Sequence, residues 1–329
     1  MRTIGTEEHF VSEAVLSAWA RSDPDTAGAF RSRAGEGELA HRLAELGDER
    51  IAWMDAVGLD VQVISLTSPG LHNLPAGEAV ALQTETNDLI AATVSRHPER
   101  LQGFATLATP APEAAAAELE RVVRGLGLQG ALLFGRTGER NLDASENWVI
   151  FEAAESLRAP LYIHPQAPQP AVRQAIYEGY GDGISSAFAT RGIGWHYETG
   201  IQFLRLCLAG VFERFPELQV ILGHWGEVIL FYLERADELA LQAQLARPFT
   251  EYVRRNAYIT PGGVYSHRYL RWACEVVPAD RLLFAADYPY RPAPEMGIRA
   301  WLDAGELGPG TTEAIAAGNW DALTARIHR

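Results

Sequence analysis

Carboxylates and imidazoles occur in four short motifs, each of which directly follows an apolar run. The motifs are Glu7-Glu8-His9, His164-Pro165, His224-Trp225-Gly226-Glu227 and Asp287-Tyr288-Pro289. The apolar runs are typical of buried strands. In a closed parallel barrel the carboxyl ends of the strands meet on one rim, so residues that are far apart in sequence can surround one ion. Imidazole and carboxylate groups are the usual ligands of divalent metals, so the motifs predict a metal site or an acid/base site.

The first motif places Glu7 and His9 two residues apart at the end of a predicted strand. Side chains at positions i and i+2 of a strand point to the same face, so one carboxylate and one imidazole would point inward together as metal ligands. Glu8 would point the other way, which predicts a structural role. The alternative is an ordinary paired carboxylate at Glu7 and a core histidine at His9.

Two further motifs each contribute one candidate ligand. His164 precedes Pro165, and a residue before proline is held extended, which restricts the direction of its ring. Asp287 follows the last predicted strand, where it could bind metal, act as an acid or base, or do both. The alternatives are a packed histidine at a strand end and an aspartate that starts a turn before Pro289.

His224 and Glu227 form a pair that suits acid/base chemistry. His224 ends a predicted strand, and Glu227 follows three residues later in the first turn of a predicted helix. A hydrogen bond from the imidazole to this carboxylate would set the tautomer of the ring and raise its basicity. The alternative is that Glu227 only favours a helix N-terminus while His224 is buried and satisfied.

The motifs need a scaffold of alternating strands and helices. Apolar runs predict strands at residues 3–6, 61–66, 101–105, 131–134, 161–164, 220–222, 257–259 and 282–285. Helical spacing predicts helices at residues 76–97, 112–126, 147–157 and 201–215. Thr109 is a candidate cap for the second of these helices. This alternation over residues 1–329 predicts one domain of the α/β class, a (β/α)8 TIM barrel.

Two segments do not fit the repeat. Residues 10–46 are polar and loop-like, with some helix near the end, and residues 166–194 are rich in Gly, Pro and Gln. Both follow a motif strand, so we expect insertions on the rim that carries the site, where long loops shape a pocket or contact another subunit.

Composition excludes several kinds of chemistry. All 28 basic residues are arginine, so Schiff-base catalysis, a P-loop and a carboxylated lysine between two metals are excluded. A net charge of -14 argues against nucleic-acid binding. The chain has no apolar run long enough for a membrane span and no signal-like start, so we expect a cytoplasmic protein. Cys207 and Cys274 are expected to be free thiols.

The order of the motifs resembles the metal-dependent decarboxylase branch of the amidohydrolase superfamily, which includes decarboxylases of γ-resorcylate, 2,3-dihydroxybenzoate and 5-carboxyvanillate. Residues 50–60, 65–70 and 192–210 carry further resemblance. The resemblance implies an amidohydrolase-like TIM barrel that holds one divalent metal ion, Mn²⁺ or Zn²⁺. The residues that match the metal ligands are Glu7, His9, His164 and Asp287.

The same resemblance implies roles around the metal. His224 and Glu227 match catalytic residues beside the substrate, and Arg50 and Arg235 match substrate-binding residues. The implied partner is a small-molecule aromatic carboxylate, with neither nucleic acid nor membrane. The implied assembly is a homodimer or homotetramer in which residues 166–194 and 241–255 pack between subunits.

Some positions depart from the family pattern, and they bear on the substrate. The family often has Asn-Gly-x-Thr where this chain has Phe134-Gly135-Arg136-Thr137. Arg291 and Gln202 stand where the family often has Glu and His, and Trp320 replaces an Ala. If Arg136 and Arg291 reached the pocket, they would favour a more anionic or differently shaped substrate. The alternative for both arginines is a surface salt bridge, which is favoured for Arg291.

The predicted reaction is the non-oxidative decarboxylation of a hydroxylated aromatic acid by a carboxy-lyase of aromatic acid catabolism. Direct loss of CO2 would leave an aryl anion, and prior protonation of the ring carbon avoids it. Asp287 is the predicted acid. His224, oriented by Glu227, would take the phenolic proton or hold the carboxylate.

Three other functions compete with this prediction. A metal-dependent hydrolase, such as a lactonase or amidase, would use the metal to activate water. A hydratase acting on an unsaturated dicarboxylate and a non-catalytic binding barrel are also consistent with the motifs. The superfamily's hydrolases more often begin with His-x-His and often use a carboxylated lysine, so Glu7-x-His9 and the absence of lysine favour the decarboxylase.

Overall fold

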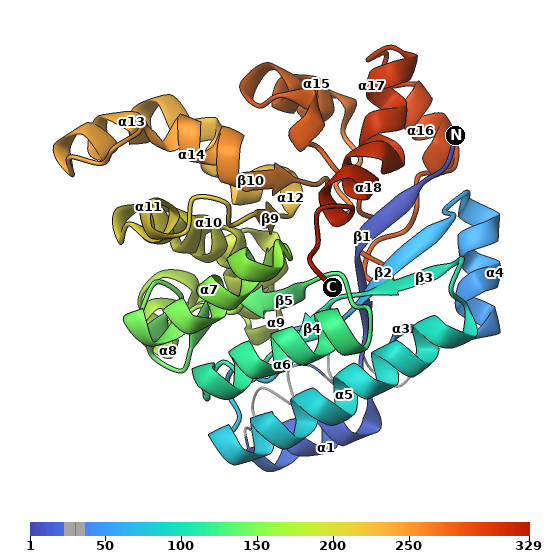
Figure 1. Cartoon of the computed structure of the whole chain (residues 1–329), viewed down its shortest axis with the longest axis horizontal. Coiled ribbons are helices and arrows are strands. Elements are labelled where there is room, and N and C mark those ends of the chain that lie inside the picture. The colour runs from blue at the N-terminus through green and yellow to red at the C-terminus, as the bar shows by residue number, and fades with distance from the viewer. Residues whose placement is uncertain (23–29, 31–36) are drawn as a thin grey trace.

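Parallel strands form the centre of the molecule, and helices surround them (Figure 1). The computed structural model describes residues 1–22, 30 and 37–329. The strands pair in the orders β1-β2-β3 and β10-β9-β8-β5-β4. Their bounds are Ile4–Phe10 (β1), Val61–Leu66 (β2), Leu101–Gly103 (β3), Ala105–Thr106 (β4), Ala131–Phe134 (β5), Leu161–His164 (β8), Val220–Leu222 (β9) and Ala257–Ile259 (β10).

Residues 282–288 close the barrel between β10 and β1. Leu282 bridges Ile259 of β10, Tyr288 bridges Glu8 of β1, and Thr6 N donates to Phe284 O at 3.0 Å. The segment makes single bridges instead of a continuous ladder, so the strand predicted at 282–285 is present only as a closing segment. The TIM barrel is confirmed.

The barrel interior and the layer under the helices are both apolar. Inside lie Ile4, Val63, Phe104, Leu132, Tyr162, Ile221, Leu283 and Trp320, all buried. Trp320 also donates from Nε1 to Gln102 Oε1 at 2.7 Å. Strands that are buried on both faces read as continuous apolar runs, which is why most strand positions were predictable.

The outer layer consists mainly of α4, α5, α6, α7, α10, α13, α14, α15 and α16. Their bounds are Asp48–Val57, Ala76–Arg96, Pro112–Gly125, Trp148–Leu157, Gly194–Leu208, Leu233–Gln242, Phe249–Asn256, His267–Val276 and Ile298–Asp303. α18 (Asn319–Thr324) instead packs Trp320 and Leu323 into the barrel interior. Shorter elements include α11 (Val211–Arg214), α17 (Pro309–Glu313) and a hairpin of β6 (Arg136–Thr137) with β7 (Arg140–Asn141). No helix within the described residues is both long and apolar enough to cross a membrane.

Two details of the helix predictions were wrong. Thr109 does not cap α6; the N-cap is Ala111, and Thr109 Oγ1 instead accepts a hydrogen bond from Thr137 Oγ1 at 2.7 Å. The helix predicted at 201–215 is two helices, α10 and α11, because Gly210 adopts a φ of 78° that ends the first. Cys207 is buried, Cys274 is half-buried, and both are free thiols.

The first insertion contains more helix than predicted. Residues 10–46 include α1 (Glu13–Ser22) and α3 (Glu38–Ala44), while residues 23–29 and 31–36 lie outside the described part of the chain. α1 forms because Val15, Ala18 and Trp19 bury one face, and Trp19 Nε1 donates to Gly70 O at 2.7 Å.

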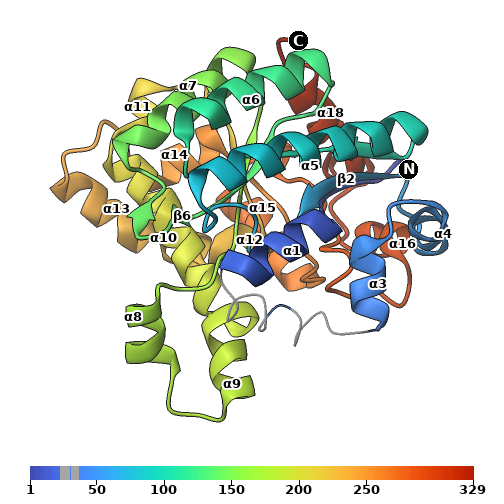
Figure 2. The same ribbon diagram turned by 90° about the horizontal axis from the view of Figure 1, so that it is seen from below.

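The second insertion forms a lobe that projects from the barrel (Figure 2). It consists of α8 (Pro170–Val172), η2 (Arg173–Tyr177), α9 (Asp182–Ala187) and η3 (Phe188–Gly192). We call residues 166–194 the lobe. Its end, at Arg191 and Gly192, reaches the cavity described next.

Candidate active site

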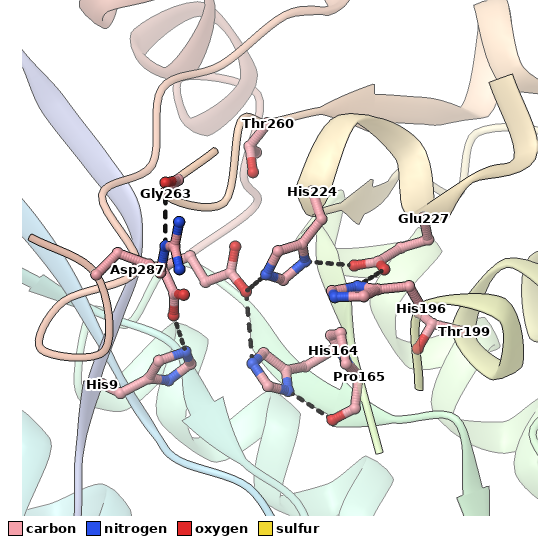
Figure 3. A network of polar contacts seen from close by, with 12 residues as sticks. His9, His164, Pro165, His196, Thr199, His224, Glu227, Thr260, Gly263 and Asp287 are labelled. Atoms are coloured by element: carbon pink, nitrogen blue, oxygen red, sulfur yellow. Dashed lines mark hydrogen bonds and ion pairs between the residues drawn. The ribbon is translucent and has the colours of Figure 1, made fainter. Parts of the chain in front are cut away.

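Four predicted metal ligands meet at the carboxyl end of the barrel. Ligand atoms of Glu7, His9 and His164 lie within 4.8 Å of one another. Glu7 Oε1 lies 3.4 Å from His164 Nε2, and Asp287 Oδ1 lies 3.5 Å from His9 Nε2. Figure 3 shows His9 paired with Asp287, and His164 beside His9.

Hydrogen bonds behind these side chains fix their directions. His164 Nδ1 donates to Pro165 O at 2.8 Å, which turns Nε2 towards Glu7. Tyr162 Oη donates to Glu7 Oε2 and contacts Thr260 Oγ1 at 3.1 Å. Such partners orient ligands and set the imidazole tautomer.

Glu8 has the structural role that was expected of it. It is fully buried and accepts hydrogen bonds from Ala286 N at 2.8 Å, Tyr288 N at 3.3 Å and Gln62 Nε2 at 3.3 Å. These bonds tie β1 to the segment that carries Asp287, so one glutamate positions candidate ligands from both ends of the chain.

The charge balance of the cluster suits a bound cation. Burial raises the pKa of Glu7 to about 8, although His224 acts in the opposite direction. Oε1 of Glu7 is buried and accepts no hydrogen bond within the described residues. A divalent ion would offset the cost of two carboxylates at this place, and a mixed set of imidazole and carboxylate donors fits Mn²⁺ or Zn²⁺.

The expected contact between His224 and Glu227 is present. His224 Nδ1 donates to Glu227 Oε1 at 2.7 Å, and His224 Nε2 lies 3.9 Å from Glu7 Oε1. Glu227 was expected in an ordinary first helical turn. Instead α12 (His224–Glu227) passes through positive φ values of 46°, 59°, 80° and 53°. This left-handed turn follows β9 directly.

His196 at the start of α10 was missed by the sequence analysis. Its Nδ1 donates to Glu227 Oε2 at 2.7 Å, so Glu227 is bonded by two imidazoles. Burial acts to raise the pKa of Glu227, but His224 and His196 outweigh it and lower the pKa to about 2. The only sequence signal was a histidine beside Trp195 inside the matching stretch 192–210.

A cavity of about 900 Å³ opens beside the cluster. His164, His224 and Asp287 reach it from the barrel, and its apolar walls include Trp195, Phe231 and Trp272. Aromatic walls of this kind suit a planar ring.

The structure does not bring Arg50 and Arg235 to this cavity. Arg50 is fully buried; Nη2 donates to His9 O at 2.9 Å, and the guanidinium lies 4.6 Å from the ring centroid of Tyr288. Arg50 therefore stabilises β1, the strand that carries Glu7 and His9. The side chain of Arg235, on α13, is 77% exposed and pairs with Glu238.

The positions that depart from the family pattern separate into two groups. Arg136 donates to Gly138 O and Ala167 O, and Gln202 bonds to Asn141 and Leu142, so both are structural. Arg291 lines the cavity, and no carboxylate of the described residues lies within ion-pair distance of it. The surface salt bridge considered for Arg291 is absent from the described residues.

The chain belongs to the amidohydrolase family, whose model matches residues 15–319. It is 32% identical to the gamma-resorcylate decarboxylase of Polaromonas sp. over 87% of this chain and 88% of that protein. It also resembles the crystal structure of 5-carboxyvanillate decarboxylase from Sphingomonas paucimobilis, with 33% identity, a TM-score of 0.90 and 99% of each chain covered.

A further related structure contains a metal and a ligand. It is 5-carboxyvanillate decarboxylase from Novosphingobium aromaticivorans, complexed with manganese and 4-hydroxy-3-methoxy-5-nitrobenzoic acid. Its identity to this chain is 28% and its TM-score is 0.89, with 98% of this chain and 96% of that chain covered.

Proposed function

We propose that the protein is a metal-dependent, non-oxidative decarboxylase, a carboxy-lyase, of a hydroxylated aromatic carboxylic acid. The observation that carries the proposal is the place of Asp287, which lines the cavity and lies 3.5 Å from the candidate ligand His9. A carboxyl group there can coordinate the ion and can also protonate a ring carbon of the substrate. The decarboxylase names of the relatives support this class.

One divalent ion would be held by Glu7, His9, His164 and Asp287. Manganese is the first choice because a related structure contains it, and zinc is the second. When bound, the ion supplies positive charge that stabilises anionic oxygens of the substrate.

The residues of this chain account for the proton transfers. Asp287 delivers a proton to the ring carbon that bears the carboxylate, which forms the new C–H bond. The C–C bond to the carboxylate then breaks, its electron pair returns to the ring, and CO2 leaves. His224 has Nδ1 bonded to Glu227 and Nε2 directed at the cluster, so it is placed to take the phenolic proton.

The proposal is tested by substrate turnover. Protein loaded with Mn²⁺ is mixed with γ-resorcylate, 2,3-dihydroxybenzoate, 5-carboxyvanillate and salicylate, and ultraviolet spectra and CO2 release are recorded together. Turnover of one acid that stops on chelation of the metal supports the decarboxylase. No turnover with one bound metal per chain contradicts it, and lactones, amides and unsaturated dicarboxylates would then be tested.

We infer that the chain assembles with further copies of itself. The lobe exposes Ile176, Tyr180 and Ile184, and large apolar side chains are also exposed on η4 (Ile229–Tyr232) and α13. Clusters of exposed large apolar side chains typically mark a protein interface. Light scattering should give a dimer or tetramer, and Ile184→Asp should reduce its size; a monomer at all concentrations contradicts the inference.

The two free thiols support a cytoplasmic location.

A further inference from the structure

A row of four polar side chains runs from the cavity wall to His224. Trp195 Nε1 donates to His196 Nε2 at 3.0 Å, and His196 Nδ1 donates to Glu227 Oε2 at 2.7 Å. Glu227 Oε1 then accepts from His224 Nδ1 at 2.7 Å. Figure 3 shows His196 and His224 bonded to the same carboxylate.

The chemistry of the row fixes the tautomer of His196. An indole N–H can only donate, so Nε2 of His196 must accept with its lone pair. The proton of the neutral ring then lies on Nδ1, which donates to Glu227. His196 thus occupies one oxygen of Glu227, and only the other oxygen is left for His224.

This arrangement matters because Glu227 is fully buried. Without His196, its Oε2 would have no imidazole partner, and a buried unpaired oxygen is costly. The carboxylate would then rotate or admit water, and the ring of His224, which it holds, would change direction.

We propose that His196 is a positioning residue for the proposed decarboxylation: it fixes Glu227 and, through Glu227, directs Nε2 of His224 towards the substrate. The inference rests on the proposed function for its kinetic part. Trp195 and His196 also line the cavity, so the row of hydrogen bonds connects the cavity wall to His224.

The same three residues, His196, His224 and Glu227, are close enough to hold a metal ion. Both Nδ1 atoms already donate to Glu227, so a metal would have to displace both hydrogen bonds. We therefore expect one metal ion per chain. Two ions per chain, with the second lost in His196→Phe, would overturn the positioning role in favour of a metal site.

Kinetics of three variants test the role. His196→Phe should lower kcat by about 10- to 100-fold with KM and metal content unchanged, as for other residues that orient a catalytic group. His196→Gln should recover most of the activity, because its amide can donate to Glu227 and accept from Trp195. His267→Phe is the matched control. The ring of His267 also packs on a tryptophan, with its centroid 5.2 Å from that of Trp301, but His267 does not line the cavity.

A double variant tests whether His196 acts through Glu227. Adding His196→Phe to Glu227→Gln should cause no further loss of kcat, because the group it positions is already altered. Full additivity would overturn the inference. So would an unchanged kcat in His196→Phe alone.

A measurement without substrate separates this inference from the proposed function. ¹⁵N spectra of histidine-labelled, metal-free protein at neutral pH should show the resonances of His196, identified by their loss in His196→Phe, with Nδ1 protonated and Nε2 unprotonated. The opposite tautomer contradicts the positioning role. An inactive wild-type protein with the expected tautomer would instead contradict the decarboxylase alone.

Discussion

The phenol of Tyr162 donates a hydrogen bond to Oε2 of Glu7, while Oε1 of the same carboxylate faces His164 at 3.4 Å. Tyr162 is fully buried and also contacts Thr260. A residue inside the barrel therefore determines which oxygen of Glu7 is available to an ion. The ligand geometry depends on the packed interior as well as on the rim.

Tyr162→Phe tests this dependence. Loss of the phenol leaves Glu7 free to turn, so the affinity for Mn²⁺ should fall by about 10- to 100-fold. Tyr252→Phe is the matched control, because the Tyr252 hydroxyl is buried and makes no hydrogen bond within the described residues. Calorimetric titration of metal-free protein measures both. Equal affinities in the two variants would show that Tyr162 does not orient the ligand.

Asp287→Asn should separate metal binding from turnover. An amide oxygen can still coordinate an ion, but the amide cannot deliver a proton to the ring carbon. We expect metal content to stay near one per chain and kcat to fall by about 10²- to 10⁴-fold, the usual contribution of a positioned acid. Metal analysis and CO2 release measure the two quantities. Substantial activity with bound metal would rule out Asp287 as the acid.

Arg291 should favour a substrate with a second negative charge. It lines the cavity, and no carboxylate of the described residues lies within ion-pair distance of it. Arg291→Gln should lower kcat/KM for 5-carboxyvanillate by about tenfold relative to salicylate, as expected for loss of one charge contact. Arg235→Gln, at an exposed position on α13, should change neither value. An equal loss of kcat/KM for both acids in Arg291→Gln would show that Arg291 does not recognise the second negative charge.

Most strands and the grouping of the candidate ligands could be predicted because they depend on short-range rules. Strands buried on both faces are continuous apolar runs, and the Glu7-x-His9 spacing places two side chains on one face. β1 nevertheless extends to Phe10, beyond the predicted end at residue 6. Its buried polar residues look like a strand end in sequence. They stay in the strand because the segment 282–288 bonds the side chain of Glu8 and the backbone of His9, while Tyr162 bonds Glu7.

The residues that were missed or misplaced depend on tertiary contacts. His196 reaches Glu227 only because the chain turns through positive φ at His224–Glu227, which local propensity does not predict. Arg50 matched a substrate-binding position, but its guanidinium bonds to the carbonyl oxygens of His9, Arg42 and Glu45. A sequence pattern does not reveal whether an arginine bonds to its own backbone or faces a cavity.

His72 gives a test that is independent of the reaction. Its ring is 2% exposed, packs on Phe134 at a centroid distance of 4.9 Å, and has no hydrogen-bond partner within the described residues. Burial, with a smaller effect from Arg136, lowers the pKa of His72 from 6.5 to about 3. The folded chain therefore keeps this ring neutral at pH values where the unfolded chain binds a proton.

The sign of the resulting pH dependence follows from that difference. Well above pH 6.5, His72 is neutral in both the folded and the unfolded state, so it does not lower the free energy of unfolding. As the pH falls from 6.5 towards 3, His72 binds a proton in the unfolded state but stays neutral in the folded state, which favours unfolding. The free energy of unfolding should fall by about 1 kcal/mol per pH unit from this group. His72→Phe keeps an aromatic ring against Phe134 and should remove that part of the slope. Urea unfolding of metal-free wild-type and variant protein measures the difference, in which the contributions of other groups cancel. Identical slopes would mean that the folded protein protonates His72 as readily as the unfolded chain does.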